Sequence, residues 1–145
     1  ERCLTSDLVT VAAASALPLV IGSAGPLALS ADARIVGVAV VCFSYFFGTV
    51  FYVKTNIRQR GRLDYLAYSI AWHLACTVLV AFVDFGFSKI ALTTFFAAAT
   101  VRAWLVPWRG AMHGRPVAAG VLGRWEIVMT LALVAILVPH LLTSG

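Results

Sequence analysis

The sequence predicts an all-α membrane protein, a polytopic bundle of about five transmembrane helices, and three observations support this prediction. Hydrophobic residues make up 61% of the 145 residues and charged residues only 12%, against roughly 25% charged residues in a soluble domain. A soluble chain of this length could not hide so much apolar surface. The apolar residues form long uninterrupted runs, which favour helices over the alternating strands of a membrane β-barrel. Most Lys and Arg residues fall between these runs.

Five apolar segments approach the roughly 20 residues that a spanning helix needs. The first contains Pro18, so we expect its second half to be kinked or partly unwound. The second follows Asp32, a residue type favoured at helix N-caps, and the fourth ends before Pro107. In the fifth, Ala119 and Gly123 have the spacing of small residues at close helix contacts. The expected spans are residues 8–29, 35–53, 66–83, 90–105 and 125–142, and we expect the helix of the fifth span to begin between Val117 and Trp125.

The distribution of Lys and Arg predicts the orientation in the membrane. With a cytoplasmic N-terminus, eight basic residues fall on the cytoplasmic side, and two, Arg34 and Lys89, fall on the other. This bias predicts a multi-pass protein of the inner (plasma) membrane, with the N-terminus inside and the C-terminus outside. We expect residues 1–145 to form one membrane-embedded domain and, since they begin with Glu1, to be the C-terminal part of a longer chain. The eight cytoplasmic residues are Arg2, Lys54, Arg58, Arg60, Arg62, Arg109, Arg115 and Arg124.

The densest polar stretch follows the second expected span and contains Lys54, Arg58, Arg60 and Arg62. These residues could set the topology and contact anionic lipid head groups. They could instead form a site for a phosphate, diphosphate or carboxylate. If the second helix continues past the interface, Lys54 and Arg58 share one face, and Tyr52 is near enough to donate a hydrogen bond. The candidate anion-binding residues are therefore Tyr52, Lys54 and Arg58.

Three ionisable residues fall within expected spans, where such groups are costly. His73 lies in the third span, Arg102 in the fourth, and Glu126 near the start of the fifth. Because consecutive spans are antiparallel, all three belong to the cytoplasmic half, and together with the basic loop they predict a cytoplasm-facing polar pocket. Arg102 either extends to the interface or pairs with Glu126. His73 either packs between helices or relays protons.

The other polar groups point to no metal, cofactor or nucleic acid. His73, His113 and His140 fall on different helices or sides and lack the spacing of metal ligands. Cys42 and Cys76 lie inside expected spans, as small packing residues do. The basic residues form no continuous face, and no nucleotide-binding or catalytic fingerprint is present. The expected partners are the lipid bilayer, anionic lipid head groups and a small-molecule or lipid ligand of unknown identity.

In several stretches the chain resembles the YwiC-like family of bacterial integral membrane proteins. The resemblance covers most of the chain, from about the second span to the fifth, and it implies a bacterial cell membrane and a helical fold. The family has no established activity, so the resemblance implies none here. The stretches are residues 48–61, Trp72-His73, residues 101–110, and Arg115-Pro116 leading into Gly123 and Glu126.

The layout is more distantly similar to the C-terminal half of UbiA-type prenyltransferases: two spans, a polar motif beginning at Tyr52, then three spans. In those enzymes aspartates of this loop bind Mg²⁺-diphosphate, whereas here the loop is basic and only Asp64 is acidic. That departure disfavours metal-dependent prenyl transfer, although a basic loop could hold an anionic head group without metal. Two functions stay open. One is a transporter-like or accessory membrane protein with a polar pocket, and the other is an intramembrane transferase acting on an isoprenoid or lipid.

Overall fold

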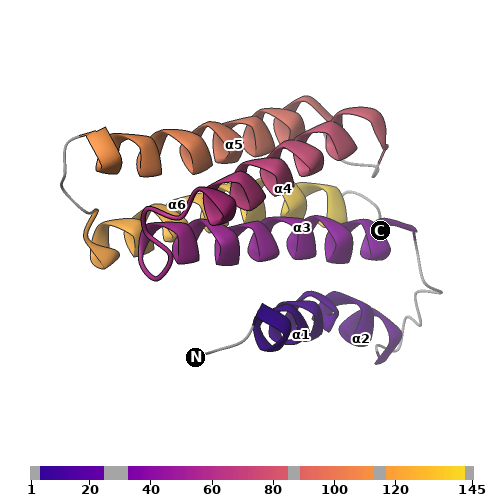
Figure 1. Cartoon of the computed structure of the whole chain (residues 1–145). Helices are drawn as coiled ribbons and strands as arrows, with labels where there is room; N and C mark the ends of the chain where they lie inside the picture. Colours follow the sequence, from indigo (N-terminus) through magenta and orange to yellow (C-terminus); the bar gives the residue numbers. More distant parts are fainter. Residues whose placement is uncertain (1–3, 25–32, 85–88, 113–116, 143–145) are drawn as a thin grey trace.

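The computed structural model describes residues 4–24, 33–84, 89–112 and 117–142, and Figure 1 shows their arrangement. The regular structure of these residues is entirely helical, as predicted. Four of the described helices, against about five expected, are long and apolar enough to cross a membrane. The helices are α1 (Leu4–Ser15), α2 (Leu17–Ala24), α3 (Ala33–Asn56), α4 (Leu63–Phe82), α5 (Lys89–Met112) and α6 (Ala119–Leu142).

The first expected span, residues 8–29, differs from the prediction. Its described part consists of α1 and α2, which are separated at Ala16, and neither is long enough to span a membrane alone. The break lies just before Pro18, whose ring nitrogen cannot donate a helical hydrogen bond. It therefore precedes the segment's second half, where we had expected the kink. Residues 25–29 and the expected N-cap Asp32 lie outside the described residues.

The later helices are longer than the expected spans, most clearly at the C-terminal end of α5. Helix α5 continues through Pro107 to Met112, although Leu105 was the expected end. A proline removes one hydrogen bond and kinks a helix without having to end it, and membrane helices tolerate this more readily. Helix α6 begins at Ala119, within the expected interval from Val117 to Trp125, because polar Arg124 and Glu126 interrupt the apolar run without breaking the helix.

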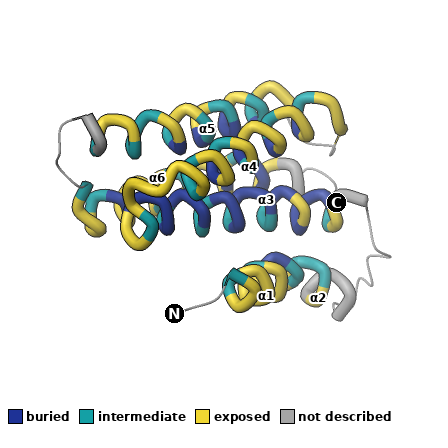
Figure 2. Tube along the Cα trace, in the orientation of Figure 1, coloured by how far each residue is buried: buried dark blue, intermediate teal, exposed yellow. Residues whose placement is uncertain are grey.

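Helix α3 is the centre of the bundle and contacts each of the other five helices. Figure 2 shows that burial is concentrated along α3, while the outer faces of α4, α5 and α6 are exposed. Within the bilayer no hydrophobic force drives helices together, so close van der Waals packing has to hold this core. The main core cluster consists of Val38, Val41, Tyr45, Cys76, Val80, Leu92, Phe95, Phe96, Leu133 and Leu137.

The α3–α4 interface is built from aromatic side chains. Phe43, Phe47 and Phe51 lie on one face of α3 at a spacing of four residues, and Trp72 of α4 packs on all three. The Trp72 and Phe47 rings have their centroids 4.9 Å apart in an edge-on arrangement. The indole N–H of Trp72 donates a 2.9 Å hydrogen bond to the Ser44 carbonyl oxygen. This contact orients α4 so that the next residue, His73, also faces α3.

The outer surface of the bundle is apolar, as expected of helices in contact with lipid. Helix α6 is the least buried of the four long helices. Its exposed side chains include Ile127, Leu131 and Val134. The predicted close contact through Ala119 and Gly123 is wrong among the described residues. Both residues are exposed, and a Cβ added at Gly123 would meet nothing within 4 Å.

Candidate functional site

Side chains from four helices form a polar group inside the bundle, which we call the buried polar cluster. It comprises Tyr45, Thr49 and Tyr52 of α3, His73 of α4, Arg102 of α5 and Glu126 of α6. The three α3 residues fall on one face because positions separated by four and by three residues are neighbours on a helix. Helix α3 thus presents one polar stripe to α5 and α6.

The centre of this cluster is an ion pair between Arg102 and Glu126. Arg102 Nη1 lies 2.7 Å from Glu126 Oε1, and the two side chains are only 11% and 16% exposed. The other carboxylate oxygen, Oε2, accepts hydrogen bonds from the Tyr45 hydroxyl at 2.9 Å and the Thr49 hydroxyl at 3.2 Å. The pairing anticipated from the sequence is therefore present. Both oxygens of a carboxylate within the membrane are compensated, as its burial requires.

The Arg102 guanidinium has fewer hydrogen bonds than the Glu126 carboxylate. Its carbon Cζ lies 4.2 Å from the centre of the Tyr52 ring, a favourable cation–π arrangement. However, Nε, Nη1 and Nη2 are all buried, and none makes a well-aligned hydrogen bond with the described residues. The close contact to Glu126 is thus an ion pair and not a linear hydrogen bond. A guanidinium carries five N–H donors, so Arg102 retains hydrogen-bonding capacity within the bundle.

His73 packs against Gly48 of α3 at the edge of this cluster. Its Nδ1 lies 2.7 Å from the Ser69 carbonyl oxygen, and because a carbonyl only accepts, Nδ1 carries the proton. Nε2 is buried and without a hydrogen-bond partner among the described residues. A Cβ added at Gly48 would lie 3.0 Å from His73 Nε2 and 3.1 Å from Trp72 Cδ1. Glycine at position 48 is what lets α4 approach α3 this closely.

A second site, which we call the basic pocket, lies between α1 and the C-terminal part of α3. Lys54 Nζ forms a 2.5 Å ion pair with Asp7 Oδ2, and both side chains are largely buried. Arg58 lies in the turn just beyond the end of α3, lines the same pocket and is exposed. The pocket has a volume of about 380 Å³, and Asp7, Thr49, Val50, Val53, Lys54, Ile57 and Arg58 line it.

Tyr52 does not join Lys54 and Arg58 at this pocket. It is fully buried and packs with Ala103 and Leu122 beneath Arg102. Residues two apart on a helix differ by about 200° in direction, so Tyr52 and Lys54 face opposite sides. Of the three anion-binding candidates, the structure brings Lys54 and Arg58 together and places Tyr52 in the buried polar cluster.

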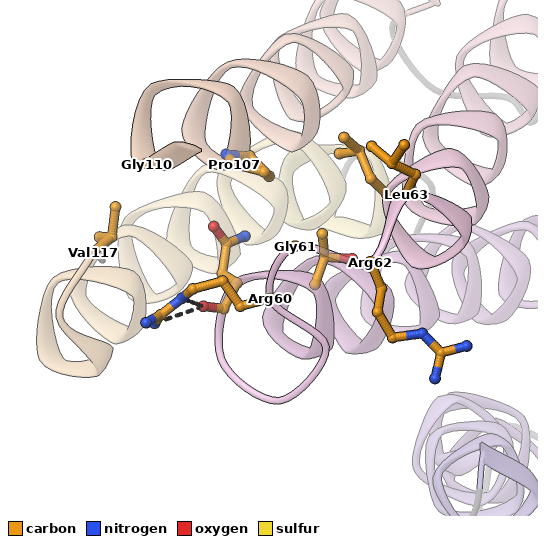
Figure 3. A pocket seen from close by; sticks show the side chains of 10 residues that line it. Arg60, Gly61, Arg62, Leu63, Pro107, Gly110 and Val117 are labelled. Carbon is orange, nitrogen blue, oxygen red and sulfur yellow. Dashed lines mark hydrogen bonds between the residues drawn. The ribbon is translucent and has the colours of Figure 1, made fainter. Parts of the chain in front are cut away.

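Arg60 and Arg62 belong to the turn between α3 and α4. Arg60 donates hydrogen bonds of 3.2 and 3.0 Å to the Asn56 carbonyl oxygen at the end of α3. Arg62 pairs with Asp64, and this contact raises the pKa of the Arg62 guanidinium. Figure 3 shows Arg62 pointing away from a cavity of about 230 Å³ between this turn and the end of α5. Gly61, with φ of +80°, permits the turn.

Four residues of these sites were not identified from the sequence: Tyr45, Thr49, Gly48 and Asp7. The spacing of Tyr45, Thr49 and Tyr52 was a usable signal, because hydroxyl groups repeated on one face of a spanning helix need partners. Nothing in the sequence marked Asp7 as the partner of Lys54. His113 lies outside the described residues, and so does the side chain of His140. Among the residues that the structure does describe, no group of acidic, His or Cys side chains could hold a metal ion.

The chain was also compared with known proteins. No family model, no curated protein and no solved structure matches it.

Proposed function

We propose that this protein is a transporter-like or accessory multi-pass membrane protein that recognises an anionic group in the basic pocket. The observation that carries the proposal is the combination of Lys54, Arg58 and Asp7 around a pocket of about 380 Å³. Two cations and one carboxylate leave the pocket with an excess positive charge. Asp7 holds Lys54 in place, and exposed Arg58 offers the planar donors that suit phosphate and carboxylate groups.

The transporter-like part of the proposal is supported by Thr49. This residue lines the basic pocket, and its hydroxyl also bonds Glu126 in the buried polar cluster. A pocket at one end of the bundle is therefore one side chain away from ionisable groups within the membrane. Such groups, when buried inside a membrane protein, mark ion or substrate pathways more often than they mark simple packing.

We also propose an orientation of the protein in the membrane and a family to which it belongs. Lys54, Arg58, Arg60 and Arg62 gather at one end of the bundle, at the turn joining α3 to α4 (Figure 1), and such a basic bias favours the cytoplasmic side. The Asp7–Lys54 pair puts the beginning of α1 at the same end. We accordingly propose that α1 and α2 together act as a fifth, broken span, and that the protein is of the YwiC-like kind, on the stretches quoted above.

The transferase alternative has no specific support at this pocket. Asp64, the single acidic residue of the basic loop, pairs with Arg62 on the exposed surface. It does not line the basic pocket. An intramembrane transfer reaction with a diphosphate would need acidic residues placed to hold Mg²⁺ beside the substrate, and we therefore propose no second function.

The test replaces one basic residue of the pocket by another, so that the charge is kept. Calorimetry on the detergent-purified protein measures the binding of inorganic phosphate and of diphosphate. Arg58→Lys keeps the charge but loses the two-pronged geometry, and we expect affinity to fall about tenfold, as for loss of one charge-assisted hydrogen bond. Arg62→Lys, which changes an arginine that pairs with Asp64 and does not line the basic pocket, is the matched control and should bind as the original protein does.

Binding to lipid vesicles tests whether the ligand of the basic pocket is a free anion or a lipid head group. If the soluble anions do not bind but vesicles containing anionic lipid are bound more tightly than neutral ones, and Arg58→Lys weakens this, the ligand is a head group. If Arg58→Lys and Lys54→Arg leave both phosphate and vesicle binding unchanged, the basic pocket recognises no anion and the proposal is wrong.

A further inference from the structure

The Glu126 side chain is only 16% exposed, yet it is bonded to a residue that lines the basic pocket, Thr49. The Thr49 hydroxyl donates to Glu126 Oε2 across 3.2 Å, and Thr49 also lines the pocket. A pocket of about 380 Å³ is large enough for several water molecules. A hydroxyl can pass its own proton to an acceptor while taking another from a water on its far side, because it is both donor and acceptor.

Arg102 is the group that would respond to a proton on Glu126. In the ionised state the carboxylate compensates the guanidinium at 2.7 Å. A neutral Glu126 would leave Arg102 as an uncompensated charge within the membrane, which is strongly disfavoured. Its three buried nitrogen atoms already lack well-aligned hydrogen bonds among the described residues. A small anion is the partner that would restore both the charge balance and these hydrogen bonds.

The other groups around the pair do not supply that compensation. Tyr45 and Tyr52 of α3 face the pair as neutral phenols, and the Tyr52 hydroxyl is buried without a partner among the described residues. His73 of α4, the titratable group that faces Arg102 from that helix, is bonded through Nδ1 to a backbone carbonyl. Arg124 of α6 is exposed. Within the described cluster, Glu126 is the one carboxylate facing Arg102.

We propose that the Arg102–Glu126 pair is a proton-coupled anion site. One proton from the bulk solution passes by way of water in the basic pocket and the Thr49 hydroxyl to Glu126 Oε2, and Arg102 then binds a monovalent anion in place of the carboxylate. The net charge of the site does not change, since one proton and one monovalent anion bind together. This deepens the transporter-like function proposed above and rests on it for the role of the pocket as the proton's entry.

The first experiment uses the unaltered, detergent-purified protein and chloride as the probe. Calorimetry in two buffers of different ionisation enthalpy at the same pH measures the protons taken up with each chloride. We expect about one proton per chloride, and therefore an affinity that rises about tenfold for each unit by which the pH falls. Chloride binding without proton uptake, or no chloride binding at about pH 5, overturns the proposal.

The second experiment uses Glu126→Gln, a neutral side chain that imitates the protonated carboxyl. This variant should bind chloride without proton uptake and with an affinity that no longer depends on pH. Thr77→Val is the matched control. Thr77 makes a comparable interhelical hydrogen bond, to Thr100, away from the pair, so this variant should keep the proton uptake. A Glu126→Gln protein that retains it shows that another group takes the proton and the assignment is wrong.

The failure of this proposal can be told apart from failure of the proposed function. Arg58→Gln should weaken phosphate binding at the basic pocket and leave the proton uptake per chloride unchanged, because Arg58 does not contact the pair. If phosphate binds at the basic pocket but chloride brings no proton, only the proton-coupled site is rejected. If chloride brings a proton while no anion recognises the basic pocket, only the earlier proposal is rejected.

Discussion

The Tyr45 hydroxyl donates a 2.9 Å hydrogen bond to Glu126 Oε2, although 81 residues separate the two in the chain. This bond joins the central helix α3 to α6, which otherwise has the smallest buried share of the four long helices. Its acceptor is a carboxylate that also faces Arg102 of α5. A phenol in the middle of α3 therefore helps to fix the position of two other helices.

Replacing Tyr45 by Phe removes this hydrogen bond while keeping the ring. We expect a loss of about 1–2 kcal/mol in the free energy of unfolding, near the upper end for hydrogen bonds between membrane helices, because the acceptor is charged. Thermal unfolding in detergent measures the change. Tyr68→Phe alters an exposed tyrosine and should leave stability unchanged. An equal effect of both substitutions would contradict the role assigned to Tyr45.

The Arg102–Glu126 pair should behave as one unit in a double-mutant cycle. Arg102→Ala leaves Glu126 buried and uncompensated, so each single substitution should cost about 3–5 kcal/mol. Removing both charges should cost clearly less than the sum. The exposed Arg62–Asp64 pair is the control and should show little coupling. Additive losses at Arg102 and Glu126 would show that they do not interact in the folded protein.

Gly48 should not tolerate even a methyl group. A Cβ there would lie 3.0 Å from His73 and 3.1 Å from Trp72, so one ring has to shift. We expect Gly48→Ala to destabilise the protein by about 1–3 kcal/mol, as overpacking does. Gly120→Ala is the control, because nothing lies within 4 Å of its Cβ position. It should be neutral or stabilising by up to about 1 kcal/mol, since alanine favours the helix.

The proposed orientation places the C-terminal end of α6 outside the cytoplasm. A reporter enzyme that is active only outside the cytoplasm, fused after Gly145, should therefore be active, and a fusion within the turn at Gln59 should be inactive. The basic residues at the turn between α3 and α4 are the physical reason. The reverse pattern of activity would reject both the orientation and the cytoplasmic placement of the basic pocket.

The sequence predicted the long helices well because uninterrupted apolar runs have few alternatives in a bilayer. It also anticipated the Arg102–Glu126 pair, since two opposite charges at similar depth on neighbouring antiparallel helices need each other. Tyr45 was not identified, because one hydroxyl within an apolar run looks like any other core aromatic. Grouping Tyr52 with Lys54 relied on their nearness in the chain, whereas the direction of a side chain around the helix axis decides what it contacts.

The exposed position of α6 has a consequence for how the protein is made. Glu126 lies within its apolar run, and an ionised carboxylate raises the cost of moving a lone helix from the translocon into lipid. The compensating charge is on the preceding helix, at Arg102. For either helix alone, inserting its charged side chain into the bilayer costs free energy. We therefore expect α5 and α6 to leave the translocon together as a helical hairpin in which the Arg102–Glu126 ion pair has already formed. Biosynthesis would then depend on the same contact that joins α5 to α6 in the folded protein.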